Sequence, residues 1–221
     1  MKAVIFDIDN TLLNLMRMKD YCVDASIDAM IDAGLPLSKQ KAKKLLNDMY
    51  IHNIEDQKIF QKFLKKVTGK VDPKILAHAI LAYRRVKAGF LTPYPGTKPT
   101  LIALKEKGLK LAVVSDAPRL QAWTRLVSLS LDDFFDVIVT FEDTRSRKPS
   151  KKPFLKALKV LNVKPEDTLM VGDWIERDIK GAKSIGMKTA FAKYGNTTGI
   201  KGIKTADYVL HNISDLQKIL L

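Results

Sequence analysis

The sequence has few of the features that disulfide-stabilised, secreted or membrane-spanning proteins need. Its 221 residues include one cysteine, Cys22, so no disulfide can form within the chain and a reducing compartment is expected. No run approaches the roughly 20 uncharged apolar residues that cross a bilayer. Asp7 and Asp9 interrupt the apolar amino-terminal segment, as they would not in a secretory signal. We therefore expect a cytoplasmic protein with no membrane partner.

Acidic residues are also scarce relative to basic ones, with 24 Asp and Glu against 38 Lys and Arg, which gives a formal net charge of +14. Nucleic-acid binding is one interpretation, because clustered basic residues neutralise phosphates. The basic residues are instead spread through helix-like segments such as 39–44 and 62–66, without interleaved aromatic residues. A lysine-rich solvated surface is the favoured interpretation. Such a surface would also attract an anionic substrate.

Hydrophobic patterning separates a helical block from a part in which strands and helices alternate. Residues 2–6 form an apolar run typical of a buried strand. Three-to-four spacing of apolar residues then predicts helices at 19–33, 39–51, 55–67 and 73–87. Further strands are predicted at 109–114, 137–140, 168–171, 188–192 and 207–210, and helices at 119–127, 152–161, 175–185 and 213–220.

This alternation predicts an α/β fold with a doubly wound, mostly parallel sheet covered by helices. The first strand belongs to that sheet, so the helical block is an insertion directly after it. We expect residues 1–13 and 92–221 to form the α/β core. Residues 14–91 are expected to form a helical domain inserted into it.

Two carboxylates, Asp7 and Asp9, follow the first predicted strand. Residues two apart on a strand face the same side, which would bring both groups together at the strand's carboxyl end. Open α/β sheets bind their ligands at that edge. Because the two charges repel, the pair requires a cation, a shared proton or both.

Three other predicted strands and loops deliver polar groups to the same edge. Ser115 and Asp116 could receive anionic oxygens, although a turn or helix cap is the commoner reason for such a pair. Lys148 lies in a loop crowded with basic residues, and its ammonium suits a phosphate or a carboxylate. Gly172 and Asp173 end another strand, and Asp178 follows on the first helical turns.

An all-oxygen ligand set favours Mg²⁺ as the cation at this edge. Zinc is not expected, because the three histidines are scattered at positions 52, 78 and 211 and the single cysteine stands apart from them. The four groups together point to one reaction centre more strongly than any of them alone.

In this order, the residues resemble the four motifs of the haloacid dehalogenase superfamily. The matching positions are the run 7–12 (DIDNTL), Ser115 with Asp116, Lys148 with Pro149, and Gly172 and Asp173 with Asp178. The block at 14–91 resembles the helical cap of the subfamily that carries its insertion after the first strand. The resemblance implies a Rossmann-like core and phosphoryl transfer through an aspartyl-phosphate.

The same resemblance implies a role for each matching residue. Asp7 would be the nucleophile, and Asp9 would act as general acid and then as general base. Ser115, the N–H of Asp116 and Lys148 would hold the phosphoryl oxygens. Mg²⁺ would be bound by Asp7, the backbone carbonyl of Asp9 and Asp173, with Asp178, Thr11 and Gly172 in support.

A carboxylate at position 9 favours a phosphatase, a phosphoric monoester hydrolase, because the dehalogenases lack that group. A phosphomutase of a sugar phosphate has the same motifs and stays the alternative, and a basic nucleic-acid-binding protein without turnover is the less favoured third. The expected substrate is a small phosphorylated metabolite, either a triose or sugar phosphate or a nucleotide. The choice of substrate is expected to depend on the cap. The sequence indicates no oligomeric state.

Overall fold

The structure, a computed structural model, describes residues 1–52, 56–196 and 205–221. The chain divides into two compact units, which are described separately. One unit consists of Met1–Leu15 with Leu91–Leu221, and the other is Met16–Phe90. The larger unit contains every strand of the described residues, and the smaller unit is helical.

Six parallel strands form one sheet in the larger unit, in the order β3-β2-β1-β4-β5-β6. Their bounds are β1 (Ala3–Phe6), β2 (Lys110–Val114), β3 (Val137–Val139), β4 (Thr168–Gly172), β5 (Lys188–Ala192) and β6 (Tyr208–Leu210). The central strand β1 is buried along its whole length, as expected of a parallel strand covered on both faces. The predicted doubly wound α/β fold is confirmed.

The register of the sheet determines which residues meet at its carboxyl edge. Phe6 at the end of β1 pairs with Val113 of β2 on one side and with Val171 of β4 on the other. The residue after Phe6 therefore lies beside the last residues of both neighbouring strands. That alignment places the chain segments after β1, β2 and β4 next to one another.

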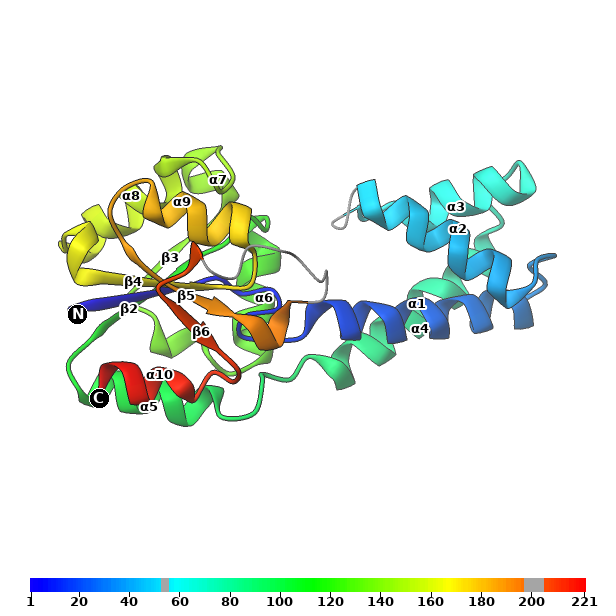
Figure 1. The fold of residues 1–221 in the computed structure, drawn as a ribbon. Helices are drawn as coiled ribbons and strands as arrows, with labels where there is room; N and C mark the ends of the chain where they lie inside the picture. Colours follow the sequence, from blue (N-terminus) through cyan, green and yellow to red (C-terminus); the bar gives the residue numbers. More distant parts are fainter. Residues whose placement is uncertain (53–55, 197–204) are drawn as a thin grey trace. The chain divides into compact units, whose positions relative to one another are not determined.

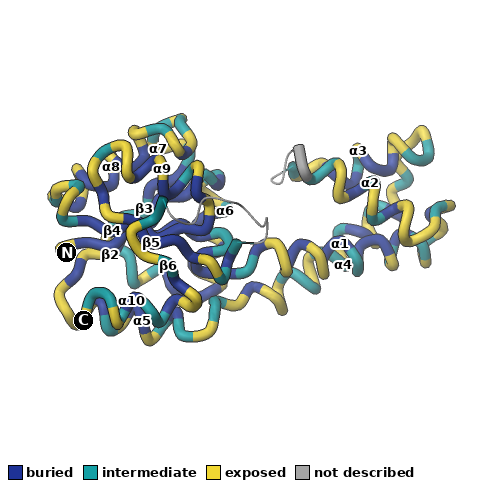
Figure 2. Tube along the Cα trace, viewed as in Figure 1, coloured by how far each residue is buried: buried dark blue, intermediate teal, exposed yellow. Residues whose placement is uncertain are grey.

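Helices cover both faces of the sheet, with α8 and α9 on one face and α5 and α10 on the other (Figure 1). Their bounds are α5 (Thr97–Glu106), α6 (Arg119–Ser128), α7 (Phe141–Thr144), α8 (Lys151–Leu161), α9 (Lys180–Lys183) and α10 (Asp215–Leu220). Single short turns lie at Asp132–Phe134, Pro165–Asp167 and Lys193–Gly195. Figure 2 shows the strands between these helices as the most continuously buried part of the unit.

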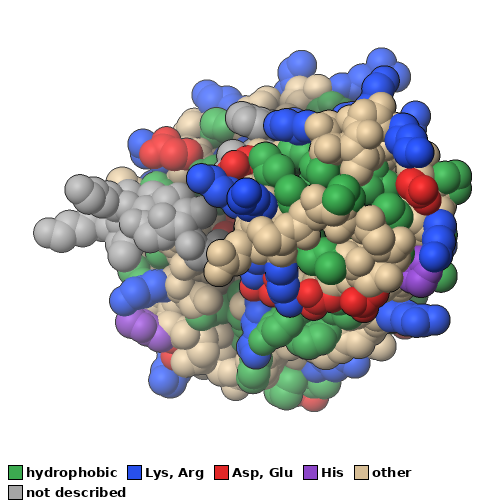
Figure 3. All heavy atoms as spheres, turned by 90° about the vertical axis from the view of Figure 1, so that its right-hand side faces the viewer, with side chains coloured by type: hydrophobic (Ala, Val, Ile, Leu, Met, Phe, Trp, Pro, Cys, Tyr) green, Lys and Arg blue, Asp and Glu red, His purple; other side chains and the backbone are tan. Residues whose placement is uncertain are grey.

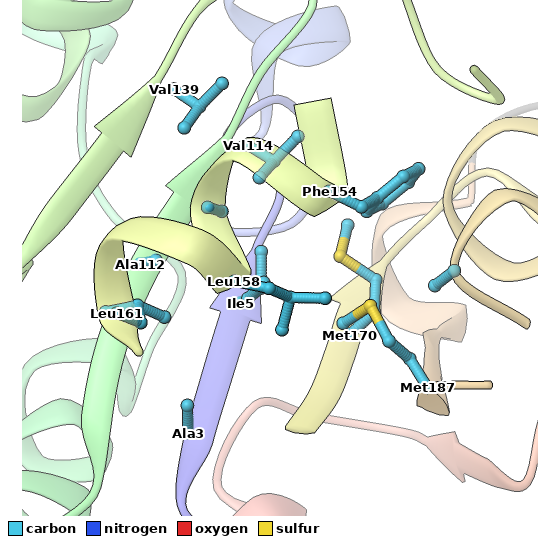
Figure 4. Close-up of a cluster of buried hydrophobic side chains, with 12 residues drawn as sticks. Ala3, Ile5, Ala112, Val114, Val139, Phe154, Leu158, Leu161, Met170 and Met187 are labelled. Carbon is cyan, nitrogen blue, oxygen red and sulfur yellow. The ribbon is translucent and has the colours of Figure 1, made fainter. Parts of the chain in front are cut away.

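The packing of α8 on the sheet shows how the core is built. Phe154, Leu158 and Leu161 recur at helical spacing and are buried against Ile5 of β1 and Val114 of β2 (Figure 4). Burying a side chain of this size contributes about 1.5–3 kcal/mol. The strands that carry the polar edge residues therefore rest on a well-packed support.

Two elements of this unit differ from the sequence-based expectation. Helix α5 was not predicted, because Pro95, Gly96 and Pro99 indicate a turn; Pro99 is tolerated because it lies in the first helical turn, where its missing N–H is not needed. The helix expected over 175–185 is shorter and begins with a π-helical turn at Ile175–Ile179. Such turns are frequent at functional sites.

The smaller unit consists of α1 (Leu15–Asp32), whose first residue belongs to the larger unit, α2 (Lys39–His52), α3 (Ile59–Thr68) and α4 (Pro73–Phe90). It has its own core, in which Ile27, Leu46 and Phe63 are fully buried. Asp72 caps α4 by accepting hydrogen bonds from the N–H groups of Lys74 and Ile75. The predicted start of the third helix at residue 55 lies outside the described residues. None of the described helices is long and apolar enough to cross a membrane.

Candidate active site

Asp7 lies at the carboxyl end of β1, between β2 and β4. Its backbone N–H donates a hydrogen bond to the carbonyl of Val171 at 2.9 Å, which continues the ladder one residue past the strand. One carboxylate oxygen, Oδ1, lies 2.6 Å from Nζ of Lys148. The sheet therefore holds the backbone of Asp7, while a lysine 141 residues away orients its side chain.

Lys148 is the buried cation of the site, with 5 % of its surface exposed. Besides Asp7, its ammonium contacts Oδ1 of Asp178 at 2.7 Å. Burial works against the ammonium charge, but the carboxylates of Asp178 and Asp7 outweigh it and raise the pKa of Lys148. The lysine therefore stays charged and can also contact an anionic ligand at this position.

Three buried carboxylates, those of Asp7, Asp173 and Asp178, surround this lysine. One oxygen from each lies within 4.8 Å of the others. Burial and repulsion by Asp178 and Asp7 raise the pKa of Asp173, in spite of Lys148. Burial, opposed by Lys148 and reinforced by Asp7, raises the pKa of Asp178. One ammonium does not balance three carboxylates, so this oxygen donor set fits a hard divalent cation such as Mg²⁺.

Ser115 and Asp116 form the turn after β2. The hydroxyl of Ser115 accepts a hydrogen bond from the N–H of Ala117 at 3.2 Å, so the ordinary turn role is present. Asp116 accepts a hydrogen bond from the backbone N–H of Lys148 at 2.9 Å, and its other oxygen lies 3.6 Å from Arg177. Asp116 therefore connects the loop that contains Lys148 to this turn.

At position 172, the end of β4, there is no room for a side chain. A Cβ atom built there would overlap the Asp178 carboxyl group, whereas the backbone of Gly172 is not left-handed. Asp178 is only 1 % exposed and accepts a hydrogen bond from the N–H of Trp174 at 3.0 Å. The close approach of Asp178, which is buried within the site, therefore explains why a glycine ends this strand.

Two further positions complete the edge of the site. Thr11 is fully buried, and its carbonyl accepts a hydrogen bond from the Tyr194 hydroxyl at 2.8 Å. Trp174, the residue after Asp173, is partly exposed. Its ring carries the guanidinium of Arg177 at 4.0 Å. The contact between Arg177 and the Trp174 ring was not expected from the sequence.

Asp9 is placed differently from the expectation that it shares a strand face with Asp7. Strand β1 ends at Phe6, and the chain turns at Asn10, which has a φ of 56°. The rule for residues two apart on a strand therefore does not apply. Oδ2 of Asp9 forms an ion pair with Nη1 of Arg125 at 3.1 Å, and Asp9 is not among the three clustered carboxylates.

Arg125 is a site residue that the sequence analysis missed. It lies on α6, on the same buried face as Ala122 and Leu126, and is 5 % exposed. A charged residue on the apolar face of an amphipathic helix was the available signal. Its partner, 116 positions earlier in the sequence, could not be inferred from that signal.

Known proteins resemble this chain over nearly its whole length. The sequence profile of haloacid dehalogenase-like hydrolases matches residues 4–192. Glyceraldehyde 3-phosphate phosphatase of Methanocaldococcus jannaschii is 35 % identical, over 99 % of this chain and 96 % of its own. Phosphoglycolate phosphatase of Aquifex aeolicus is 32 % identical, over 100 % and 97 %. The crystal structure of a HAD phosphatase from Thermococcus onnurineus is 30 % identical with a TM-score of 0.73, covering 100 % and 98 % of the two chains.

Proposed function

This chain belongs to the haloacid dehalogenase-like hydrolase family, and we propose that it is a Mg²⁺-dependent phosphatase acting through an aspartyl-phosphate. It is a phosphoric monoester hydrolase, since its full-length relatives are phosphatases. The observation that supports the mechanism most directly is the contact of Lys148 with Asp7 inside a cluster of three buried carboxylates. Phosphoryl transfer through an aspartyl-phosphate needs a nucleophilic carboxylate, and a lysine beside it can stabilise the charge on the transferring group.

In the first half-reaction, a carboxylate oxygen of Asp7 attacks phosphorus, and the bond from phosphorus to the leaving oxygen breaks. The carboxyl of Asp9 gives its proton to that oxygen, so the product is a neutral alcohol. Lys148, the Ser115 hydroxyl and the N–H of Asp116 hold the other phosphoryl oxygens. These donors stabilise the negative charge in the transition state.

In the second half-reaction, a water molecule attacks phosphorus and transfers a proton to the Asp9 carboxylate. The bond between phosphorus and the Asp7 oxygen breaks, which releases inorganic phosphate and restores both carboxyl groups. Asp9 thus serves as acid and then as base, as reversal of its proton transfer requires.

The Mg²⁺ ligands would be Asp7, Asp173 and the backbone carbonyl of Asp9, with Asp178 in support. The carboxylate cluster described above fits that role, because its oxygens are close together and buried. When bound, Mg²⁺ neutralises negative charge on the phosphoryl oxygens and on the carboxylates around them.

The proposed substrate is a small phosphorylated metabolite, and a triose phosphate is the first candidate. Glyceraldehyde 3-phosphate phosphatases are among the relatives that match nearly the whole chain. We assign the helical unit, Met16–Phe90, the role of a cap that selects the substrate and excludes water.

Purified protein tests this proposal directly. It should release phosphate from p-nitrophenyl phosphate and from at least one member of a panel of glyceraldehyde 3-phosphate, phosphoglycolate, sugar phosphates and nucleotides, and chelation of Mg²⁺ should stop the reaction. Asp7→Asn should lower kcat by at least about 1,000-fold, because the nucleophile is lost. Turnover that is independent of Mg²⁺, or full turnover in Asp7→Asn, would contradict the proposal.

A phosphomutase would be recognised by its products, because an isomerised sugar phosphate would accumulate with little free phosphate. The distribution of charges on one face of the molecule does not favour nucleic-acid binding. On the face drawn in Figure 3, Lys and Arg side chains are separated by hydrophobic and acidic ones. Several lysines are also ion-paired, including Lys39 with Asp28 and Lys43 with Asp24.

A further inference from the structure

The ion pair between Asp9 and Arg125 joins two segments whose relative positions matter for the proposed reaction. Asp9 belongs to the loop after β1, and Arg125 belongs to α6, the helix that follows the Ser115 turn. The two side chains are unequally buried, with 24 % of the Asp9 side chain and 7 % of the Arg125 side chain exposed. The guanidinium is thus the more deeply buried member of the pair, and Oδ1 of Asp9, the carboxylate oxygen away from this contact, is also buried.

Helix α6, which carries this guanidinium, is held in place at its buried face and at its first residue. Ala122 and Leu126 on either side of Arg125 are fully buried. At the start of the helix, the N–H of Arg119 donates to Glu142 and its guanidinium pairs with Asp143 at 2.8 Å. A side chain on an element anchored at its face and at its start holds its position better than one on a loop.

Asp9, by contrast, lies in a bent stretch of backbone. Residue Asn10 is left-handed, and a single bridge joins Asp9 to Leu13. The side chain has two rotatable bonds and is only partly buried, so the loop alone does not restrict it to one direction. Its ion pair with a buried guanidinium does, because separating the pair would leave a buried charge without compensation.

We propose that Arg125 is a positioning residue that holds the Asp9 carboxyl at the leaving oxygen of the substrate. The inference rests on the proposed function and adds a residue to it. Arg125 contacts Oδ2, so the transferable proton lies on Oδ1. It passes from there to the leaving oxygen as the bond from phosphorus to that oxygen breaks. Arg125 itself neither gains nor loses a proton.

The dependence on the leaving group distinguishes this role from a merely structural one. An alkyl phosphate such as glyceraldehyde 3-phosphate needs a proton on its leaving oxygen, whereas p-nitrophenolate leaves without one. The ratio kcat/KM reports the steps up to cleavage of the first bond, so it isolates this half-reaction. A displaced Asp9 should therefore slow the alkyl ester far more than the aryl ester.

The experiment compares the wild type with Arg125→Lys and Arg125→Gln on the two esters. The alkyl ester can be glyceraldehyde 3-phosphate or the best substrate of the panel. For Arg125→Gln, kcat/KM should fall about 10- to 100-fold on the alkyl phosphate, part of the 100- to 10,000-fold that general acid catalysis supplies. On p-nitrophenyl phosphate the same variant should change by less than about threefold, because that reaction does not need the acid. Arg125→Lys keeps the charge without the planar fork and should lie in between.

Two comparisons keep the result interpretable. In an Asp9→Asn background, Arg125→Lys should not change the ratio of the two kcat/KM values further, because the group it positions is gone. Lys105→Gln removes an exposed ion pair with Asp136 in the same unit and should leave both rates unchanged. The midpoint of thermal unfolding shows whether each variant is folded, and Arg125→Lys carries the test if Arg125→Gln does not fold.

Equal losses on both esters, or no loss on either, would overturn the role of Arg125 while leaving the proposed function intact. The proposed function fails instead if the wild type lacks Mg²⁺-dependent turnover or if Asp7→Asn stays active. The two failures are therefore distinguishable in the same set of measurements.

Discussion

At the scale of single residues, the site depends on the balance between one buried ammonium and several buried carboxylates. Lys148 contacts Asp7 and Asp178 at 2.6 and 2.7 Å and is almost fully enclosed. Breaking a buried ion pair by removing one member costs about 3–5 kcal/mol, because the remaining charge is left without compensation. The lysine therefore supports the folded site as well as the proposed chemistry.

Gly172→Ala provides a test of how tightly this site is packed. The new methyl group would overlap the Asp178 carboxyl, so either β4 or the π-helical turn must move. We expect a loss of about 1–3 kcal/mol in the free energy of unfolding, as for other overpacked positions, and a lower kcat. Chemical denaturation and phosphate release measure the two effects.

Gly89→Ala is the matched control, because a Cβ at Gly89 in α4 meets no atom within 4 Å among the described residues. That variant should be neutral or stabilising by up to about 1 kcal/mol. A Gly172→Ala protein as stable and active as the wild type would show that Asp178 has room to move.

Most of the residues at the site could be predicted from the sequence, and the exceptions share a cause. Asp7, Asp173 and Ser115 follow apolar strands, so the general rule for parallel sheets places them at one edge. Arg125 and Arg177 reach the site from helices and contact it through long side chains. Sequence periodicity gives the face of a helix, but it does not give the partner of a side chain far away in the sequence.

At the scale of elements, a side chain just before the edge strand β6 connects that strand to its neighbour β5. Asp207, just before β6, accepts hydrogen bonds from both the N–H and the hydroxyl of Thr189 on β5 at 2.8 Å, and it pairs with Lys183. Burial opposes the charge on Asp207, but the Thr189 hydrogen bonds and Lys183 outweigh it and lower its pKa. The folded protein therefore favours the ionised form of this carboxyl.

Asp207→Asn should consequently destabilise the protein in a pH-dependent way. Because the folded pKa is below the unfolded value of about 3.9, the stabilisation is complete above that value and is lost as the pH falls through the folded pKa. We expect a difference of about 1 kcal/mol between wild type and variant at pH 7, which shrinks towards zero at lower pH. Urea unfolding at pH 7, 5 and 3.5 would measure it. A difference that is constant with pH would contradict the assignment.

The types of the strands and of the longer helices were predictable, whereas short elements were not. Strand β1 and helix α8 have unambiguous patterns and lie where they were expected. Helix α5 was missed because proline and glycine at its start indicate a turn, and the π-helical turn before α9 cannot be recognised from an apolar period. Those local signals are the same for an open loop and for a helix that packs onto a sheet, so tertiary packing makes the difference.

At the scale of the whole molecule, the site is assembled from segments that only the parallel sheet brings together. Asp7, Lys148 and Asp173 are separated by up to 166 positions in the sequence, yet their groups are clustered and buried. A cation that binds this cluster binds the folded state and not the unfolded chain, in which the cluster does not exist.

Mg²⁺ should therefore raise the midpoint of thermal unfolding. At a free concentration 100 times its dissociation constant, the ion adds about 2.7 kcal/mol to the free energy of unfolding. Asp173→Asn should remove most of this effect and, without Mg²⁺, should be no less stable than the wild type, since it relieves repulsion among buried carboxylates. Differential scanning fluorimetry with Mg²⁺ and with a chelator provides the measurement.

Asp207→Asn serves as the control in that experiment, because it lies outside the cluster and should keep the full Mg²⁺ response. An equal response in Asp173→Asn would place the ion elsewhere in the molecule.

The backbone around the helical insert has a consequence for how such proteins diversify. Leu13 and Pro93 form an antiparallel bridge, and the N–H of Tyr94 donates to the carbonyl of Leu12 at 2.9 Å. The chain thus leaves the α/β unit and returns to it at one place, where these two segments are paired. Under the role proposed for the helical unit, exchanging the segment beyond this point would change the preferred substrate while the residues of the proposed reaction stay in place.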